Sequence, residues 1–405
     1  MTGVSADATY LGTGERAKVS LTAAADLLAS RRRRKGTPMV SAAELIDDAV
    51  ARGVIPGAVL AAGIGSAQPV LLHVAGDAQR DAAARRPMSA HTIFDLASLT
   101  KVTATLPCVL HLVARGAIEL DDPVRRFLPA FAGAEDDSAG KDRVTLRHLL
   151  THTAGLPEGR KYYEYLGEPA EIRAAALAEP LVSPPGSLVR YSDVGFIVLG
   201  ELCASVAGCA LDRLVRDLVC EPLDMADTGY LPQQALTDRI ASTEHVGGVA
   251  KTGVVHDENA EALGGVAGQA GLFGTATNLA SYATAWACAD SEQAAALRLP
   301  GWLRAEALAC QTEGLAGNGL PGRRGLGWGL RGERWDNMGE GWPVTGAGHT
   351  GFTGTSLSVD PPSGMWVVLL TNAVHFGRGP DHSVVGLRKS VHASAAATLL
   401  GTVVP

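Results

Sequence analysis

The chain has 405 residues and a formal net charge of −7, with 46% hydrophobic and 19% charged residues. This length allows one large two-lobed domain or two ordinary domains, and the balance is that of a globular protein with a sizeable core. The negative charge argues against nucleic acid or an anionic membrane as a partner, because both attract basic surfaces. We therefore expect a small-molecule substrate.

The chain also shows no sign of export or of a metal framework. It lacks a run of about 18 uninterrupted apolar residues, and its first residues lack the basic start and apolar core of a signal peptide. We therefore expect a cytoplasmic protein. The six cysteines form no C-x-x-C pair, so buried free thiols are expected, with no metal and no cofactor.

An N-terminal extension, residues 1–38, precedes the expected catalytic domain, residues 39–405. The extension ends in "RRRRKGTP", whose cationic run Arg31–Lys35 is better explained as a solvated linker than as an anion-binding tail. The domain then opens with a helix over 41–57, where Ser41 and Glu44 have the spacing of a capping box.

Strand patterns occur at both ends of this domain. Residues 57–78 predict one hairpin, and residues 355–372 predict another around the turn "DPPSG". Helical patterns occupy 99–115, 145–152, 194–207, 276–289 and 382–401. We predict an α+β fold, in which N- and C-terminal helices flank an antiparallel sheet and a helical lobe spans about 100–290.

The stretch "FDLASLTKVT" places Ser98 three residues before Lys101. On a helix these positions share a face, so hydroxyl and amine come within hydrogen-bond reach. Burial would favour a neutral lysine that accepts the serine proton, and the helix N-terminus would supply N–H groups to an oxyanion. A second S-x-x-K, Ser138 to Lys141, lies in a polar glycine-containing loop and is rejected.

Two further motifs have catalytic interpretations. In "YSDVG", Tyr191 is either a proton-transfer group or a tyrosine packed at a helix start. In "GHTGFTGTSLSV", Gly351 would let a substrate lie close to a strand, and the N–H of Phe352 would join that of Ser98 in an oxyanion hole. The Lys-Thr-Gly at 251–253 leads into an acidic stretch and is rejected. The i, i+4 pair of His148 and His152 is interpreted as structural rather than metal-binding.

In this order the three motifs resemble the serine β-lactamase and penicillin-binding protein superfamily, whose signature is S-x-x-K, then Y-x-N or S-x-N, then K-T-G or H-T-G. Segments such as "VTLRHLLTHTAGLP" and "PPGSLVRYSDVGFIVLGELCASVAG" are similar to the class C β-lactamase, DD-peptidase and family VIII esterase branch. The resemblance covers about residues 41–401. It implies that Ser98 is the acylated nucleophile, Lys101 its activating base and Tyr191 a second proton-transfer group. For substrate binding it implies Asp193, His349, Thr350 and Gly351.

The chain departs from this pattern at three positions. Asp193 replaces an asparagine, so a donor amide becomes a group that only accepts. His349 replaces the lysine of many relatives, and a neutral imidazole lacks its fixed charge. Gln269 stands where histidine is expected in similar chains, with no clear consequence.

These changes favour an ester, a neutral amide or an amine-bearing substrate over a β-lactam. The leading prediction is an acyl-enzyme hydrolase. The alternatives are an acyltransferase or amide-forming enzyme that uses the same acyl-serine, and a non-catalytic binding protein.

Overall fold

The structure is a computed structural model that describes residues 40–81, 85–132, 140–317, 320–334 and 336–403. The N-terminal extension and its cationic run lie outside these ranges, so their interpretation stays a prediction. Residues from Ser41 onward form the folded unit considered below.

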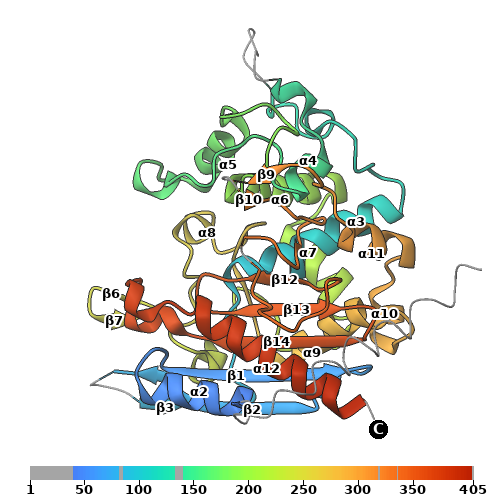
Figure 1. Ribbon diagram of the computed structural model, residues 1–405. Helices are drawn as coiled ribbons and strands as arrows, with labels where there is room; N and C mark the ends of the chain where they lie inside the picture. The colour runs from blue at the N-terminus through green and yellow to red at the C-terminus, as the bar shows by residue number, and fades with distance from the viewer. Residues whose placement is uncertain (1–39, 82–84, 133–139, 318–319, 335, 404–405) are drawn as a thin grey trace, which may run out of the picture. The chain divides into compact units, whose positions relative to one another are not determined.

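An antiparallel sheet forms the base of this unit, and its strands come from both ends of the chain (Figure 1). Their order is β11-β12-β13-β14-β1-β2-β3. The bounds are β1 (Gly57–Ile64), β2 (Leu71–Arg80), β3 (Arg85–Pro87), β11 (Gly329–Leu330), β12 (Ala347–Thr350), β13 (Ser356–Asp360) and β14 (Met365–Thr371). Both predicted hairpins, β1–β2 and β13–β14, are confirmed, and β1 pairs with β14 so that Val59 lies opposite Leu370.

Side chains along the central strands alternate between two cores, as the period of a strand requires. In β1, Val59 and Ala61 belong to the large core shared with the helical lobe, whereas Leu60 belongs to a second core. Helices α2 (Ala42–Ala51) and α12 (Val385–Val403) cover that second core. The predicted fold class is therefore confirmed.

The predicted capping box begins α2. The backbone N–H of Ser41 donates to Glu44 Oε2 at 2.8 Å, and the N–H of Glu44 donates to Ser41 Oγ at 3.2 Å. Each side chain thus satisfies a backbone donor that the helix leaves free.

The rest of the unit is mostly helical and lies on the other side of the sheet (Figure 1). Helix α9 (Ala276–Ala287) packs on β14 and β1. The further helices are α3 (Leu106–Ala114), α4 (Leu146–Leu150), α5 (Pro169–Ala178), α6 (Asp193–Ala207), α7 (Leu211–Val215), α8 (Glu258–Ala262), α10 (Glu292–Leu297) and α11 (Gly301–Leu308).

Short turns and strands complete the fold. Helical turns of the 3₁₀ or π type are η1 (Ala97–Leu99), η2 (Lys101–Thr105), η3 (Val124–Arg126), η4 (Lys141–Arg143), η5 (Tyr162–Glu164), η6 (Arg216–Cys220), η7 (Gln234–Arg239), η8 (Ala373–Phe376) and η9 (Pro380–His382). Small sheets contain β4 (Phe94–Asp95), β5 (Gly229–Tyr230) and β8 (Leu272–Gly274), then β6 (His245–Val246) with β7 (Val249–Ala250), and β9 (Ala316–Gly317) with β10 (Leu320–Pro321).

The helix that contains the serine–lysine pair runs through the core. By length and composition alone the stretch Ala97–Ala114 could cross a membrane, but 83% of it is buried inside the protein. Helix α6 and residues 211–220 pass the same test only if they are taken as one span, and they meet at 80°. All six cysteines are free thiols; Cys108, Cys203 and Cys220 are buried, as predicted, whereas Cys209, Cys288 and Cys310 are partly exposed.

Candidate active site

Ser98 lies in a turn that hydrogen bonds hold from two sides. The turn follows β4, and the N–H of Leu96 donates to the carbonyl of Leu272 at 2.9 Å. The buried carboxylate of Asp95 accepts from the N–H of Ala97 at 2.8 Å and from that of His256 at 2.6 Å. Burial raises the pKa of Asp95 to about 6 despite these bonds. The hydrogen bonds to Leu96 and Ala97 hold Ala97 at a φ of 47°, in the left-handed region of backbone conformation that alanine rarely adopts.

The segment after this turn is not the regular α-helix that the sequence predicts. Ser98 lies in the 3₁₀ turn η1, and Lys101 begins the π-type turn η2. In a 3₁₀ turn the side chains at i and i+3 eclipse each other. Lys101 Nζ accordingly donates to Ser98 Oγ at 3.0 Å, so the contact that the spacing predicts is present on a different helix type.

Lys101 is fully buried and surrounded by acceptors. Its Nζ donates to the carbonyl of Gln269 at 2.9 Å and forms an ion pair with Asp193 Oδ1 at 2.7 Å. Burial alone would lower the pKa of Lys101, but the charge of Asp193 and the nearby Tyr191 outweigh it and raise the pKa above its ordinary value. The expected neutral lysine is therefore wrong for the resting site, because Asp193 contacts the lysine.

Tyr191 closes the other side of the serine. Lys101 Nζ lies 5.2 Å from the centroid of the Tyr191 ring. Burial raises the pKa of Tyr191, while the charge of Lys101 opposes the shift. The ring of His152 lies 4.5 Å from the tyrosine ring, and His152 Nδ1 accepts from the N–H of Ser192 at 3.1 Å. His152 thus positions Tyr191, a role that its sequence pattern did not reveal.

His349 lies on β12, across the site from Asp193. Its Nδ1 donates to the carbonyl of Thr350 at 2.9 Å, and Nε2 is buried without a partner among the described residues. Burial, helped by the charges of Lys101 and Arg324, lowers the pKa of His349 well below its ordinary value. The imidazole is therefore neutral and presents an acceptor at Nε2.

The fold itself requires a glycine at position 351. A Cβ there would lie 2.1 Å from Thr355 Oγ1 and 2.5 Å from the carbonyl of Leu96, in the turn that contains Ser98. Gly351 also lines the cavity, and its expected role in admitting a substrate backbone stays a prediction.

Hydrogen bonds also join the β12–β13 connection to the turn that contains Ser98. Thr353 Oγ1 donates to the carbonyl of Asp95 at 2.8 Å, and Thr355 Oγ1 donates to that of Leu96 at 3.0 Å. These bonds fix Phe352 relative to Ser98. Within the described ranges, no group accepts a hydrogen bond from the backbone N–H of either residue, so both donors remain available for an oxyanion.

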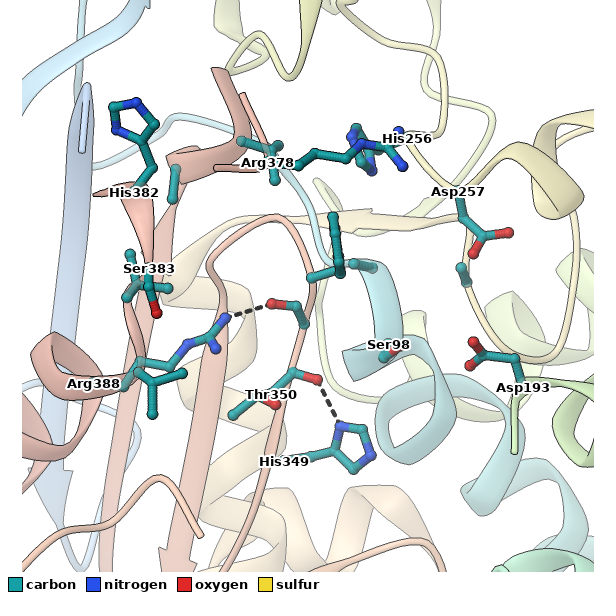
Figure 2. A pocket seen from close by; sticks show the side chains of 18 of the residues that line it. Ser98, Asp193, His256, Asp257, His349, Thr350, Arg378, His382, Ser383 and Arg388 are labelled. Carbon is teal, nitrogen blue, oxygen red and sulfur yellow. Dashed lines mark hydrogen bonds between the residues drawn. The ribbon is translucent and has the colours of Figure 1, made fainter. Parts of the chain in front are cut away.

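Ser98 opens into a cavity of about 720 Å³. Figure 2 shows Asp193 and Asp257 on one side of Ser98, with His349, Thr350 and Arg388 on the other. Arg388 comes from α12 and donates to the carbonyl of Gly351. Burial lowers the pKa of Arg388 to about 10.

The rejected motifs have structural partners. Lys141 donates to the carbonyl of Leu177 at 2.6 Å and lies over the ring of Phe131, while Ser138 is outside the described residues. Lys251 pairs with Glu261 at 2.6 Å. 

His148 and His375 already take part in hydrogen bonds. His148 Nδ1 accepts from the N–H of Thr145 at the start of α4. Among the described residues, Asp81, His245 and His375 lie close enough together for a metal. However, His375 already uses Nδ1 on the carbonyl of Thr243 and Nε2 on the N–H of Arg80.

An antiparallel sheet has the terminal helices on one face and a helical lobe on the other, and Ser98, Lys101 and Tyr191 cluster at a cavity; this arrangement is that of the β-lactamase and penicillin-binding protein class. The chain belongs to the β-lactamase family, whose model, described as "Beta-lactamase", matches residues 42–386. Members of this superfamily are generally serine hydrolases.

The chain is similar to an Escherichia coli K12 protein named "Putative D-alanyl-D-alanine carboxypeptidase", with 30% identity over 70% of each chain. It shares its fold with a penicillin-binding protein homologue from Caulobacter crescentus, at TM-score 0.68, 23% identity and coverage of 88% of this chain and 96% of the other. It also shares the fold of EstCE1, described as a hydrolase with promiscuous acyltransferase activity, at TM-score 0.65, 23% identity and coverage of 91% and 100%.

Proposed function

We propose that the protein is a serine hydrolase that cleaves an ester or amide through an acyl-enzyme on Ser98. The observation that carries the proposal is the 3.0 Å contact between Lys101 Nζ and Ser98 Oγ at the edge of an open cavity. A serine hydroxyl becomes a nucleophile when an adjacent group takes its proton. 

The charged state of Lys101 defines how the proton moves. One proton of the ammonium passes to Asp193, 2.7 Å away, and the freed amine accepts the proton of Ser98 as Oγ attacks the carbonyl. The N–H groups of Ser98 and Phe352 stabilise the oxyanion. Tyr191 donates its proton to the leaving group and regains one from the Lys101 ammonium, so the amine is free again. Water then attacks the acyl-serine as this amine takes its proton. The proton passes to Ser98 Oγ as the acid leaves, and Asp193 returns its own proton to Lys101.

The neutral side chain of His349 favours substrates that carry no carboxylate at its position on β12. His349 is neutral, so it provides no fixed charge for the carboxylate of a β-lactam or D-alanine. Asp193 only accepts hydrogen bonds and repels a substrate carbonyl. An ester, a neutral amide or an amine-bearing substrate needs neither a positive charge at His349 nor a hydrogen-bond donor at Asp193.

A substrate panel tests this assignment. A neutral fluorogenic ester, a D-amino-acid amide and a chromogenic β-lactam are each assayed for kcat/KM, with Ser98→Ala as the control. The proposal expects the ester or the amide to exceed the β-lactam and expects Ser98→Ala to be inactive. Efficient β-lactam cleavage, or activity without Ser98, would overturn it.

Acyl transfer is the second candidate, and exposed apolar side chains at the cavity favour it. Phe352 is 61% exposed and Val385 is 53% exposed, and both line the cavity, where an apolar alcohol or amine could displace water. A thioester donor with competing amines separates the two activities. Amide product in excess of acid indicates transfer, and acid alone indicates hydrolysis.

A further inference from the structure

We propose that the side of the cavity formed by Asp193 and Asp257 binds a protonated primary amine of the substrate, next to the carbonyl that Ser98 attacks. This inference rests on the proposed function, because it names the class of ester or amide that the site takes. Both carboxylates line the same cavity as Ser98 and lie on the same side of it (Figure 2).

Asp257 keeps one carboxylate oxygen for a ligand. Its Oδ1 caps α8 by accepting from the N–H of Ala260 at 2.7 Å, and it also accepts from Gln269 Nε2 at 3.3 Å. Both bonds end on the same oxygen. Oδ2 therefore has no partner among the described residues, and the side chain lines the cavity.

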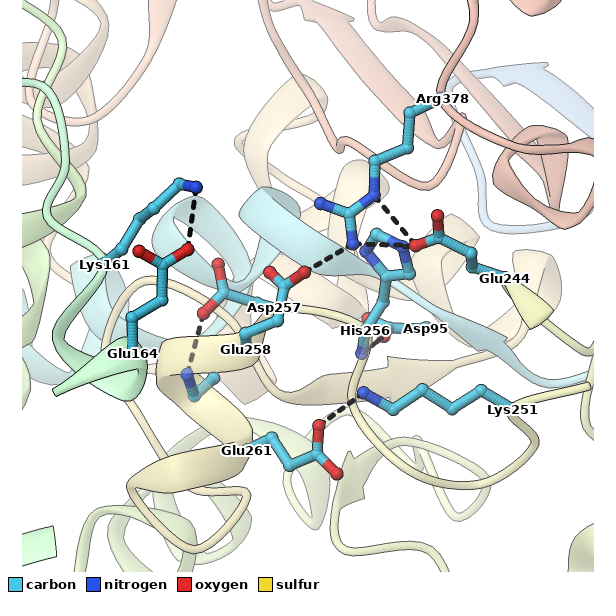
Figure 3. Close-up of polar contacts among 11 residues, drawn as sticks. Asp95, Lys161, Glu164, Glu244, Lys251, His256, Asp257, Glu258, Glu261 and Arg378 are labelled. Carbon is cyan, nitrogen blue, oxygen red and sulfur yellow. Dashed lines mark hydrogen bonds and ion pairs between the residues drawn. The ribbon is translucent and has the colours of Figure 1, made fainter. Parts of the chain in front are cut away.

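The neighbouring acidic side chains already have cations, as Figure 3 shows. Arg378 pairs with Glu244 at 2.7 Å and with Glu258 at 2.5 Å, and Lys251 pairs with Glu261 at 2.6 Å. Asp257 has no ion pair within the described ranges. Burial and the nearby charge of Asp193 raise the pKa of Asp257, because both disfavour its ionised form. A cation between the two carboxylates would offset this penalty.

Gln269 helps to orient the carboxylate of Asp257. It is fully buried, and its Nε2 donates to Asp257 Oδ1 at 3.3 Å. Oδ2 is thereby left for a ligand. An ammonium group, which has three donors and no acceptor, matches two carboxylates.

The ammonium of Lys101 does not fill this role. Lys101 is fully buried, and its Nζ is held by Ser98, Gln269 and Asp193, with no ion pair to Asp257 among the described residues. Asp193 is 35% exposed at the side chain, so its carboxylate remains accessible to a ligand while Oδ1 holds the lysine.

Two esters of equal shape test the proposal. Alanine methyl ester, as either enantiomer, carries an ammonium where methyl isobutyrate carries a methyl group. Assays by proton release at pH 6.5 keep the amine charged, because an α-amino group titrates near about 7.7–8.0. An ammonium also raises the intrinsic reactivity of an ester, so the decisive quantity is the change in the kcat/KM ratio between proteins.

The variants are Asp257→Asn, which retains an oxygen to cap α8, and Glu261→Gln, a control on the same helix outside this cavity. We expect the ratio of the amine ester to the neutral ester to fall about tenfold or more in Asp257→Asn, and to keep its wild-type value in Glu261→Gln. In the Ser98→Ala background, alaninamide should likewise bind more tightly than isobutyramide, and Asp257→Asn should abolish that difference.

An equal ratio in wild type and Asp257→Asn, with both esters consumed, would overturn the amine site and leave the proposed function standing. A wild-type protein that consumes neither ester and forms no acyl-Ser98 would instead contradict the proposed function, and this inference with it.

Discussion

Replacing Asp193 by asparagine removes the charge that holds Lys101 protonated while keeping the shape of the side chain. The two groups are 2.7 Å apart, and the lysine is fully buried. An opposite charge at such range shifts a pKa by about 1–3 units. We therefore expect the pKa of Lys101 to fall by about 1–3 units in Asp193→Asn, which equals about 1.4–4 kcal/mol of preference for the charged amine.

The pH dependence of acylation should change together with the pKa of Lys101. In the wild type the Lys101 proton moves to Asp193 within the pair, so labelling by a fluorophosphonate should vary little with pH between about 6 and 9. Without Asp193 the amine must lose its proton to solvent. The labelling rate should then rise about tenfold per pH unit below the new pKa.

Carbon-13 NMR of protein labelled at lysine Cε measures the first effect directly, and the labelling profile measures the second. Glu261→Gln, which removes the partner of Lys251 outside the cavity, is the matched control and should leave the Lys101 signal unchanged. An unchanged Lys101 pKa in Asp193→Asn would refute the ion pair as the cause of the charged state.

Four further outcomes are expected. Tyr191→Phe should slow acylation about 10²–10⁴-fold, with little change in melting temperature because the ring packing survives. A wild-type acylation rate would show that Tyr191 has only a packing role. Gly351→Ala should cost about 1–3 kcal/mol in urea unfolding, because its Cβ meets the backbone, and unchanged stability would contradict the crowding. Because His349 is neutral, the ratio of KM for an anionic and a neutral ester should stay constant from pH 5.5 to 8, and a selective gain for the anion at pH 5.5 would show that His349 titrates. Burial lowers the pKa of His392 to about 3. Below about pH 6.5 the His392 imidazole is therefore protonated in the unfolded chain but stays neutral in the native state. Stability should therefore fall as the pH drops toward 3, by up to about 1.4 kcal/mol per unit, and His392→Gln should lessen that slope; an unaltered slope would rule His392 out.

The sheet and its terminal helices could be predicted because their signals are local. The apolar runs of β1 and β2 with a short stretch between them predict one hairpin, the turn "DPPSG" predicts the other, and the Ser41–Glu44 spacing predicts the start of α2. The serine–lysine contact is equally local, since three residues separate the partners.

The electrostatics of the site could not be predicted in this way. The charge of Lys101 depends on Asp193 and on the carbonyl of Gln269, which is 168 positions away. The left-handed Ala97 depends on hydrogen bonds that reach Asp95 and the β12–β13 connection. No local pattern encodes these contacts, so the sequence predicted Asp193 as a substrate-binding residue without its ion pair to Lys101, and it assigned no role to Asp257.

The most direct test of the account is the mass of the protein after reaction with a fluorophosphonate and, separately, with a slowly hydrolysed ester. We predict a single covalent adduct in each case, mapped by peptide sequencing to Ser98 and absent from Ser98→Ala. An adduct on another residue, or no adduct from either reagent in the wild-type protein, would contradict the acyl-enzyme mechanism.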